Sequence, residues 1–159
     1  MFEKLIRTNS DLALGIARLV LGIVFFAHGS QKVLGWFGGF GFTGTMGFFT
    51  AKMGIPAPFA FLAIMAEFLG GLGLIVGFLS RIAAFGIFCN MLVAVLMVHR
   101  HFGFFANWYG NKPGEGFEYH LLAMALALLI MIKGAGAFSV DGALSKSESP
   151  ALAPNRTRA

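Results

Sequence analysis

Four long apolar runs, at residues 12–32, 58–79, 82–99 and 118–133, constrain this chain more than any other feature. At ~1.5 Å per residue the first run extends ~30 Å, the thickness of the hydrocarbon core of a bilayer. Hydrophobic residues make up 57% of the 159 residues and charged residues only 12%, which is unlike a soluble domain. The sequence therefore predicts an all-α integral membrane protein.

The connections between the runs indicate how the helices follow one another. The second and third runs are separated by the short Ser80-Arg81 turn, so these helices are expected to be antiparallel neighbours. Residues 33–53 contain six glycines among many phenylalanines, which predicts a Gly/Phe-rich interfacial loop between helices 1 and 2. We interpret this loop as an aromatic belt at the headgroups, with a lid over a ligand pocket as the alternative.

The predicted architecture is a transmembrane four-helix antiparallel bundle over residues 1–144, followed by a disordered polar tail over 145–159. Four spans place both termini on one side of the membrane. Basic residues near the span ends number five on that side and four on the other, and Arg18 adds to the terminal side. Cytoplasmic loops carry an excess of Lys and Arg, so the termini are expected in the cytoplasm.

Charge and cysteine content exclude two classes of function. The formal net charge of +5 comes mostly from basic residues at the ends of apolar runs, which predicts contact with anionic lipid and no nucleic-acid binding. Cys89 is the single cysteine, so one chain can build neither a disulfide framework nor a thiol-disulfide relay.

Ionisable residues within apolar runs are expensive in hydrocarbon and are functional candidates by position. Counting along antiparallel runs places Glu67 between Arg18 and His28, roughly one and a half helical turns from each. Arg18 is either a snorkelling anchor or the charge partner of Glu67. Glu67 is either a neutral carboxyl group hydrogen-bonded across helices or a group that exchanges protons.

All four histidines gather in the predicted outer half of the bundle, and they allow three interpretations. They are solvated interfacial side chains, or ligands of a metal or haem, or part of a quinone pocket. The metal interpretation rests on the pairs His99-x-His101 and Glu118-x-His120, which converge only at helix ends or in extended backbone. We assign Glu67 as the catalytic candidate and no metal ligand. The ligand-binding candidates are Arg18, His28, Lys32, His99, Arg100, Glu118 and His120.

Several motifs in fixed order resemble those of a known family. They are Arg18-Leu-x-Leu-Gly22, His28-Gly29-x-x-Lys32, Gly54-Ile-Pro56, Glu67-x-x-Gly70-Gly71, Gly77-x-x-x-Arg81 and Gly134-x-Gly136-x-x-Ser139-x-Asp141. Over residues 12–142 this pattern resembles the DoxX family of small four-span membrane proteins. The resemblance implies a four-helix fold in a bacterial or archaeal cytoplasmic membrane. It also implies a link to redox chemistry, since related proteins are membrane subunits of a thiosulfate:quinone oxidoreductase.

The leading hypothesis is a redox-associated membrane subunit that binds a quinone or similar lipophilic redox molecule in the outer half of the bundle. Glu67 would handle protons, while His28 and Lys32 orient the headgroup. One alternative is a non-catalytic membrane partner or assembly factor of an oxidoreductase complex, and another is a small proton-coupled transporter. The sequence is compatible with a membrane or soluble oxidoreductase partner and with a homo-oligomer.

Overall fold

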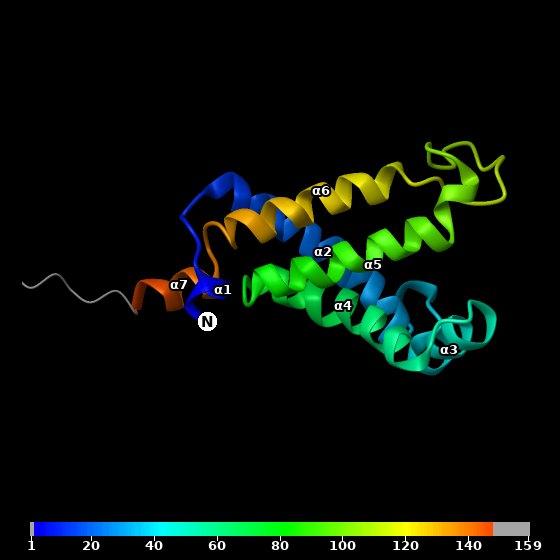
Figure 1. The fold of residues 1–159 in the computed structure, drawn as a ribbon, viewed down its shortest axis with the longest axis horizontal. Coiled ribbons are helices and arrows are strands. Elements are labelled where there is room, and N and C mark those ends of the chain that lie inside the picture. The colour runs from blue at the N-terminus through cyan, green and yellow to red at the C-terminus, as the bar shows by residue number, and fades with distance from the viewer. Residues whose placement is uncertain (1, 148–159) are drawn as a thin grey trace, which may run out of the picture.

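The computed structural model describes residues 2–147 of the chain. Its four longest helices are α2 (Leu12–Leu34), α4 (Ala57–Val76), α5 (Ser80–Met97) and α6 (Glu118–Lys133). They lie along the long axis of the molecule, and the chain reverses direction from each to the next (Figure 1). Within the described residues every regular element is helical, so the predicted all-α class is confirmed.

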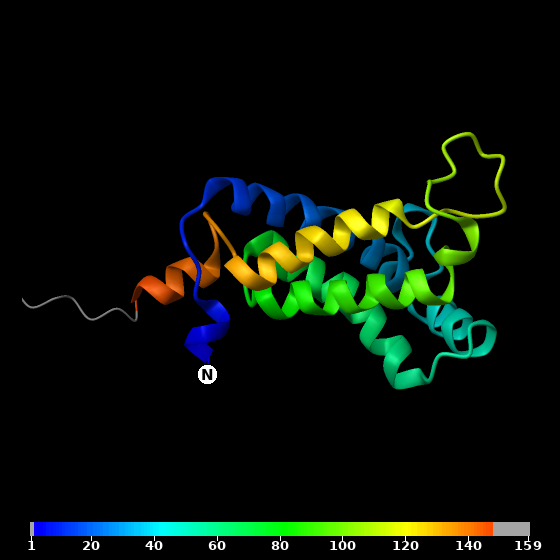
Figure 2. The same cartoon turned by 45° about the horizontal axis from the view of Figure 1, so that its top comes forward.

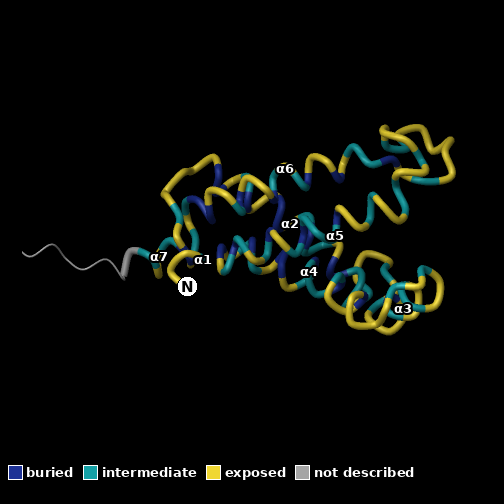
Figure 3. Tube along the Cα trace, viewed as in Figure 1, coloured by how far each residue is buried: buried dark blue, intermediate teal, exposed yellow. Residues whose placement is uncertain are grey.

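The long helices pack around a shared core. Helix α2 contacts α4 and α6, and α5 contacts the same two helices from the other side. The turned view in Figure 2 keeps the four side by side. Buried positions alternate with exposed ones along each helix, as expected where one face points inward (Figure 3). Core side chains come from all four helices and include Phe25, Leu74, Ile87, Ala127 and Ile130.

The outward faces of the long helices are apolar, the reverse of a soluble helical protein. Many large hydrophobic side chains are exposed there, including Ile23, Phe61, Leu72, Phe85, Leu122 and Ile132. Helices α2, α4 and α5 are long and apolar enough to cross a membrane. Helix α6 occupies the predicted fourth span, but its 16 residues are fewer than in any of these three.

Three of the four long helices differ from their predicted bounds of 12–32, 58–79 and 82–99: α2 ends at Leu34, α4 covers Ala57–Val76 and α5 covers Ser80–Met97. Helix α4 stops at Val76 because Gly77 adopts a left-handed conformation, with φ of 72°. Helix α5 already begins at Ser80, so the predicted Ser80-Arg81 turn is wrong and the chain reverses at residues 77–79. Hydropathy misses such ends because the intervening residues are as apolar as the helices they separate.

The Gly/Phe-rich segment expected as a loop contains three short helical pieces. These are η1 (Trp36–Gly38), a 3₁₀ turn, then α3 (Gly41–Gly47) and a π-helical turn, η2 (Phe48–Lys52). They cover the end of the molecule opposite α1 (Figure 1). Helical turns pair the backbone groups internally, which suits a segment at a membrane interface.

The two terminal helices, α1 (Phe2–Ile6) and α7 (Val140–Ser147), lie at the same end of the molecule (Figure 1). The tail predicted to be disordered begins at 145, whereas α7 continues to Ser147. Residues 148–159 of that predicted tail lie outside the described residues.

A carboxylate from α7 caps helix α5. Asp141 is 1% exposed, and its two oxygens accept hydrogen bonds from the backbone N–H groups of Leu79 at 2.8 Å and Ser80 at 2.9 Å. These N–H groups have no partner within their helix, and a carboxylate there also complements the helix dipole. The cap therefore joins the C-terminal helix to the α4–α5 turn.

We expect Asp141→Ala to lower the free energy of unfolding by about 2 kcal/mol, the upper range for losing a helix cap, because the orphaned N–H group of Ser80 is buried and that of Leu79 is half-buried. Thermal unfolding in detergent measures the change. The matched control is Asp11→Ala, which removes the cap on Leu14 N–H at the exposed start of α2, where water can substitute. Equal losses for the two variants would contradict the structural role of Asp141.

Candidate functional site

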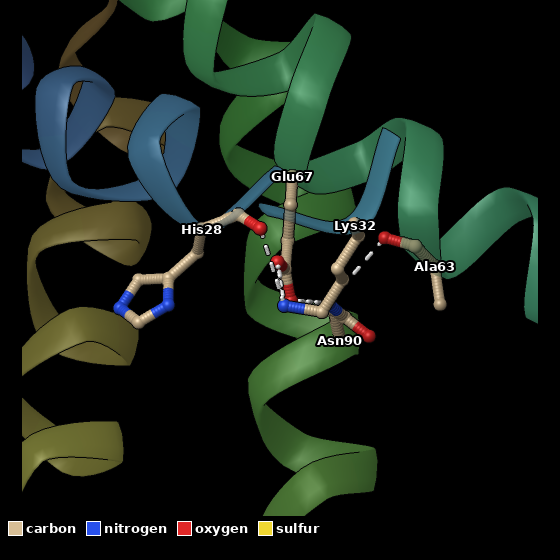
Figure 4. A network of polar contacts seen from close by, with 5 residues as sticks. All are labelled: His28, Lys32, Ala63, Glu67 and Asn90. Carbon is tan, nitrogen blue, oxygen red and sulfur yellow. Dashed lines mark hydrogen bonds and ion pairs between the residues drawn. The ribbon is translucent and has the colours of Figure 1, made fainter. Parts of the chain in front are cut away.

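A polar network joins three helices in the interior. Glu67 on α4 is 4% exposed. Its Oε2 accepts a hydrogen bond from Lys32 Nζ of α2 at 2.5 Å, and its Oε1 accepts one from Asn90 Nδ2 of α5 at 2.7 Å (Figure 4). This is the one ion pair among the described residues. Both carboxylate oxygens are therefore engaged, as a buried charge requires.

His28 takes part in this network through its backbone only. Its carbonyl oxygen accepts a hydrogen bond from Lys32 Nζ at 3.5 Å. The imidazole points away from Glu67 and toward α6 (Figure 4), where its ring centroid lies 6.5 Å from that of Tyr119. The structure therefore places His28, Lys32 and Glu67 next to one another. The His28 imidazole, however, does not face the Glu67 carboxylate.

Arg18 is not the charge partner of Glu67, and that sequence-based alternative is wrong. Its guanidinium donates to backbone carbonyls of Leu74 and Ile75 at the end of α4, and to others in the segment 135–138 after α6. Leu74 lies seven residues beyond Glu67, which is ~10 Å along α4. Arg18 is 2% exposed, so it does not snorkel to water either. Its hydrogen bonds join α2 to the end of α4 and to residues 135–138, at the end of the molecule where α1 and α7 lie.

A pair of histidines, His99 just after α5 and His120 in the first turn of α6, lies near the polar network. The rings of His99 and His120 have centroids 4.0 Å apart. His99 Nδ1 hydrogen-bonds with the Glu115 carbonyl at 2.8 Å, whereas His120 Nδ1 is buried with no partner. A buried polar atom without a partner is costly, so it marks a place where a ligand group would be favourable.

The other two ligand-binding candidates lie outside this region. Arg100 is exposed, and its Nε lies 3.4 Å from Nε2 of the adjacent His101. Glu118 accepts hydrogen bonds from Ala106 N–H and from Trp108 Nε1, both at 3.0 Å. Glu118 thus holds the loop before α6 in place.

A cavity of about 1300 Å³ connects the polar network with the histidine pair. Its walls are mainly apolar side chains of α4 and α5. Leu62, Leu69 and Phe85 line the cavity and are also exposed on the outer surface, so the cavity reaches the apolar exterior. The polar groups that line it are His28, Lys32, Glu67, Asn90, His99, Glu115, Tyr119 and His120.

The described residues hold no group of three or more His, Cys, Asp or Glu side chains arranged to bind a metal ion. The rings of His99 and His120 lie against one another at an interplanar angle of 42°, and no third side chain of these types joins them within the described residues. Residues 2–147 therefore offer no three-ligand metal site, while haem, which needs only one or two axial side chains, stays a prediction.

Sequence reasoning missed two residues of the site. Asn90 lies within the third apolar run and is not among the sequence-based candidates, although an amide in hydrocarbon is itself a signal. Tyr119 lines the cavity beside His120 and lies 5.5 Å from it, centroid to centroid. Its position in the first turn of α6 made it indistinguishable from an interfacial aromatic residue.

Apolar outer faces, three candidate spans and a buried polar network define an integral membrane protein of the helical class. The sequence pattern of the DoxX family matches residues 13–100, more than half of the chain, and the protein belongs to the DoxX family. The inner membrane protein YqjF of Escherichia coli (strain K12) is 31% identical over 136 residues, which cover 86% of this chain and 95% of that protein. No solved structure matches the chain.

Proposed function

We propose that this protein is a multi-pass protein of the bacterial inner membrane in which α2, α4, α5 and α6 all cross the bilayer as an antiparallel bundle. The inner-membrane relative and the alternating helix directions support this arrangement. Helix α6 is ~24 Å long, and Lys133 at its end can snorkel to the headgroups. Four crossings keep both termini on one side, which we assign to the cytoplasm from the distribution of basic residues.

We further propose that the cavity binds a quinone or a similar lipophilic redox molecule. The observation that carries this proposal is an apolar cavity of about 1300 Å³ that contains an unpartnered buried imidazole nitrogen at His120. Ligand sites are typically apolar clefts with a few converging polar groups. The opening toward the apolar exterior suits a ligand that arrives from the bilayer.

Quinone reduction adds two electrons and two protons to the two carbonyl oxygens. In the proposed site His120 donates a hydrogen bond from Nδ1 to one carbonyl, and electrons come from a partner oxidoreductase. Glu67 is the proton-exchanging group, but its two oxygens are held by Lys32 and Asn90. Proton exchange at Glu67 therefore requires the ion pair with Lys32 to open during turnover.

A second candidate function is a non-catalytic partner or assembly factor of an oxidoreductase complex. The full pairing of Glu67 favours it, because a saturated network locks helices together without chemistry. A conservative change separates the two functions. If Glu67→Gln lowers stability in detergent and recovery of the complex, but leaves electron transfer unchanged in the complex that still forms, the network is structural. A proton-coupled transporter would instead need water access to Glu67, which cysteine-scanning along α2 and α4 measures.

We expect His120→Phe to weaken the binding of decylubiquinone about tenfold, because one hydrogen bond in an apolar site contributes roughly 1.5 kcal/mol. Titration of the purified protein in detergent measures the dissociation constant. His101→Phe is the control, since His101 is exposed and does not line the cavity. Absence of binding by the unaltered protein, or equal affinities for the two variants, would refute the proposed site.

A further inference from the structure

A second cavity, of about 410 Å³, lies at the terminal end of the molecule. The segment between α1 and α2 forms one wall, and the start of α5 and the end of α6 form the others. Its lining residues are Arg7, Thr8, Asn9, Arg81, Ile132 and Lys133. Three of the six are basic and none is acidic, so the cavity has a strongly positive lining.

The positive charges of this cavity are not neutralised by ion pairs within the described residues, where Lys32–Glu67 is the only pair. Arg81 is fixed in place, because its guanidinium donates to the backbone carbonyls of Met131 and Ile132 in α6 and of Arg7. Those contacts also satisfy carbonyls at the C-terminal end of α6, which would otherwise repel an anion. Arg7 and Lys133 are exposed and free to reorient toward a ligand.

The cavity adjoins the apolar outer surface. Ile132 lines it and is 63% exposed, and the neighbouring Ile82 is 48% exposed. A polar, cationic hollow beside lipid-facing side chains is the setting in which basic pockets between membrane helices bind lipid headgroups. A phosphate group offers the several acceptor oxygens that Arg and Lys donors prefer.

We propose that Arg7, Arg81 and Lys133 form a binding site for a phosphate group, supplied by the headgroup of an anionic phospholipid. In this site Arg81 is the rigid cation, while Arg7 and Lys133 close over the phosphate from the two sides. The acyl chains then continue along the exposed surface at Ile132. This site is at the terminal end of the helices and is independent of the quinone proposal.

The test is native mass spectrometry of the protein released from nanodiscs that contain equal amounts of phosphatidylglycerol and phosphatidylcholine with the same acyl chains. We expect the unaltered protein to retain phosphatidylglycerol preferentially, and the double variant Arg7→Gln/Lys133→Gln to lose roughly tenfold of that preference. Lys4→Gln is the matched control, because Lys4 lies at the same end but does not line the cavity. The control should keep the preference.

A second arm adds inorganic phosphate, with chloride at equal ionic strength as its reference. Displacement of phosphatidylglycerol by phosphate alone would support the same site with a soluble ligand, and no displacement would support the lipid. The proposal is overturned if the unaltered protein shows no preference between the two lipids. It is also overturned if Lys4→Gln lowers the preference as much as the double variant does, because general surface charge then explains the effect.

Discussion

Glu67→Ala is expected to lower the free energy of unfolding by about 3 kcal/mol, because it leaves the Lys32 ammonium in the interior without its counter-charge. The same change removes the acceptor of Asn90. Breaking a buried ion pair costs about 3–5 kcal/mol, and the Lys32 side chain, at 23% exposure, regains some hydration. The lower end of that range therefore applies.

Thermal unfolding in a mild detergent, followed by tryptophan fluorescence, measures this loss. The informative comparison is the double variant Lys32→Met/Glu67→Gln, which removes both charges and keeps an acceptor for Asn90. Replacement of a buried ion pair by neutral groups often changes stability little. We therefore expect the free energy of unfolding of the double variant to lie within about 1 kcal/mol of that of the unaltered protein. If Glu67→Ala unfolds at the original temperature, Lys32 and Glu67 do not form a stabilising pair.

Gly29→Ala and Gly71→Ala are expected to destabilise the contact between α2 and α4 by about 3 kcal/mol each. A Cβ atom at Gly29 would lie 2.4 Å from the backbone of Phe68, and one at Gly71 would lie 2.4 Å from the backbone nitrogen of Phe26. Backbone cannot move aside as a side chain can, so the two helices must separate. That separation would also move Lys32 away from Glu67.

Gly70→Ala is the matched control for these two variants. It lies next to Gly71 on the same helix, but a Cβ atom there would make ordinary contact at 3.5 Å with the Ala83 carbonyl oxygen. Alanine is the better helix former by about 1 kcal/mol, so this variant should be neutral or slightly stabilising. Equal unfolding temperatures for the Gly70, Gly71 and Gly29 variants would contradict the close backbone contact between α2 and α4 at Gly29 and Gly71.

The helices themselves were largely predictable. Long apolar runs cannot remain unstructured in hydrocarbon, since each backbone group needs a partner, and helix formation supplies that partner locally. Helix α6 has the predicted bounds of 118 and 133. The short helices between α2 and α4 were missed because their glycine content opposes helix formation, while contacts with α2 and α4 stabilise them.

Most polar residues of the site were predicted from the sequence, but Asn90 and Tyr119 were missed, and the predicted pairing of Arg18 with Glu67 was wrong. Counting along a helix gives the depth of Glu67, yet depth does not give the rotation of each helix or the reach of a side chain. The flexible side chain of Lys32 reaches from α2 to the Glu67 carboxylate, a contact that counting along the helices does not predict. Arg18 lies on one side of Glu67 along the helix axis, as counting predicts. Its guanidinium, however, donates hydrogen bonds to backbone carbonyls at the end of the molecule where α1 and α7 lie.

The sequence by itself determined that this protein belongs in a bilayer, that it has four long helices with ends within a few residues of the predicted ones, and which ionisable residues enter its interior. These properties follow from local composition, because burial in a bilayer is decided residue by residue along each helix. Only the tertiary structure decided that Lys32 and Asn90 share Glu67, that His120 has a free nitrogen, and that three basic residues surround one hollow. Such pairings depend on how helices are rotated and how closely they approach, and distant parts of the chain set both together.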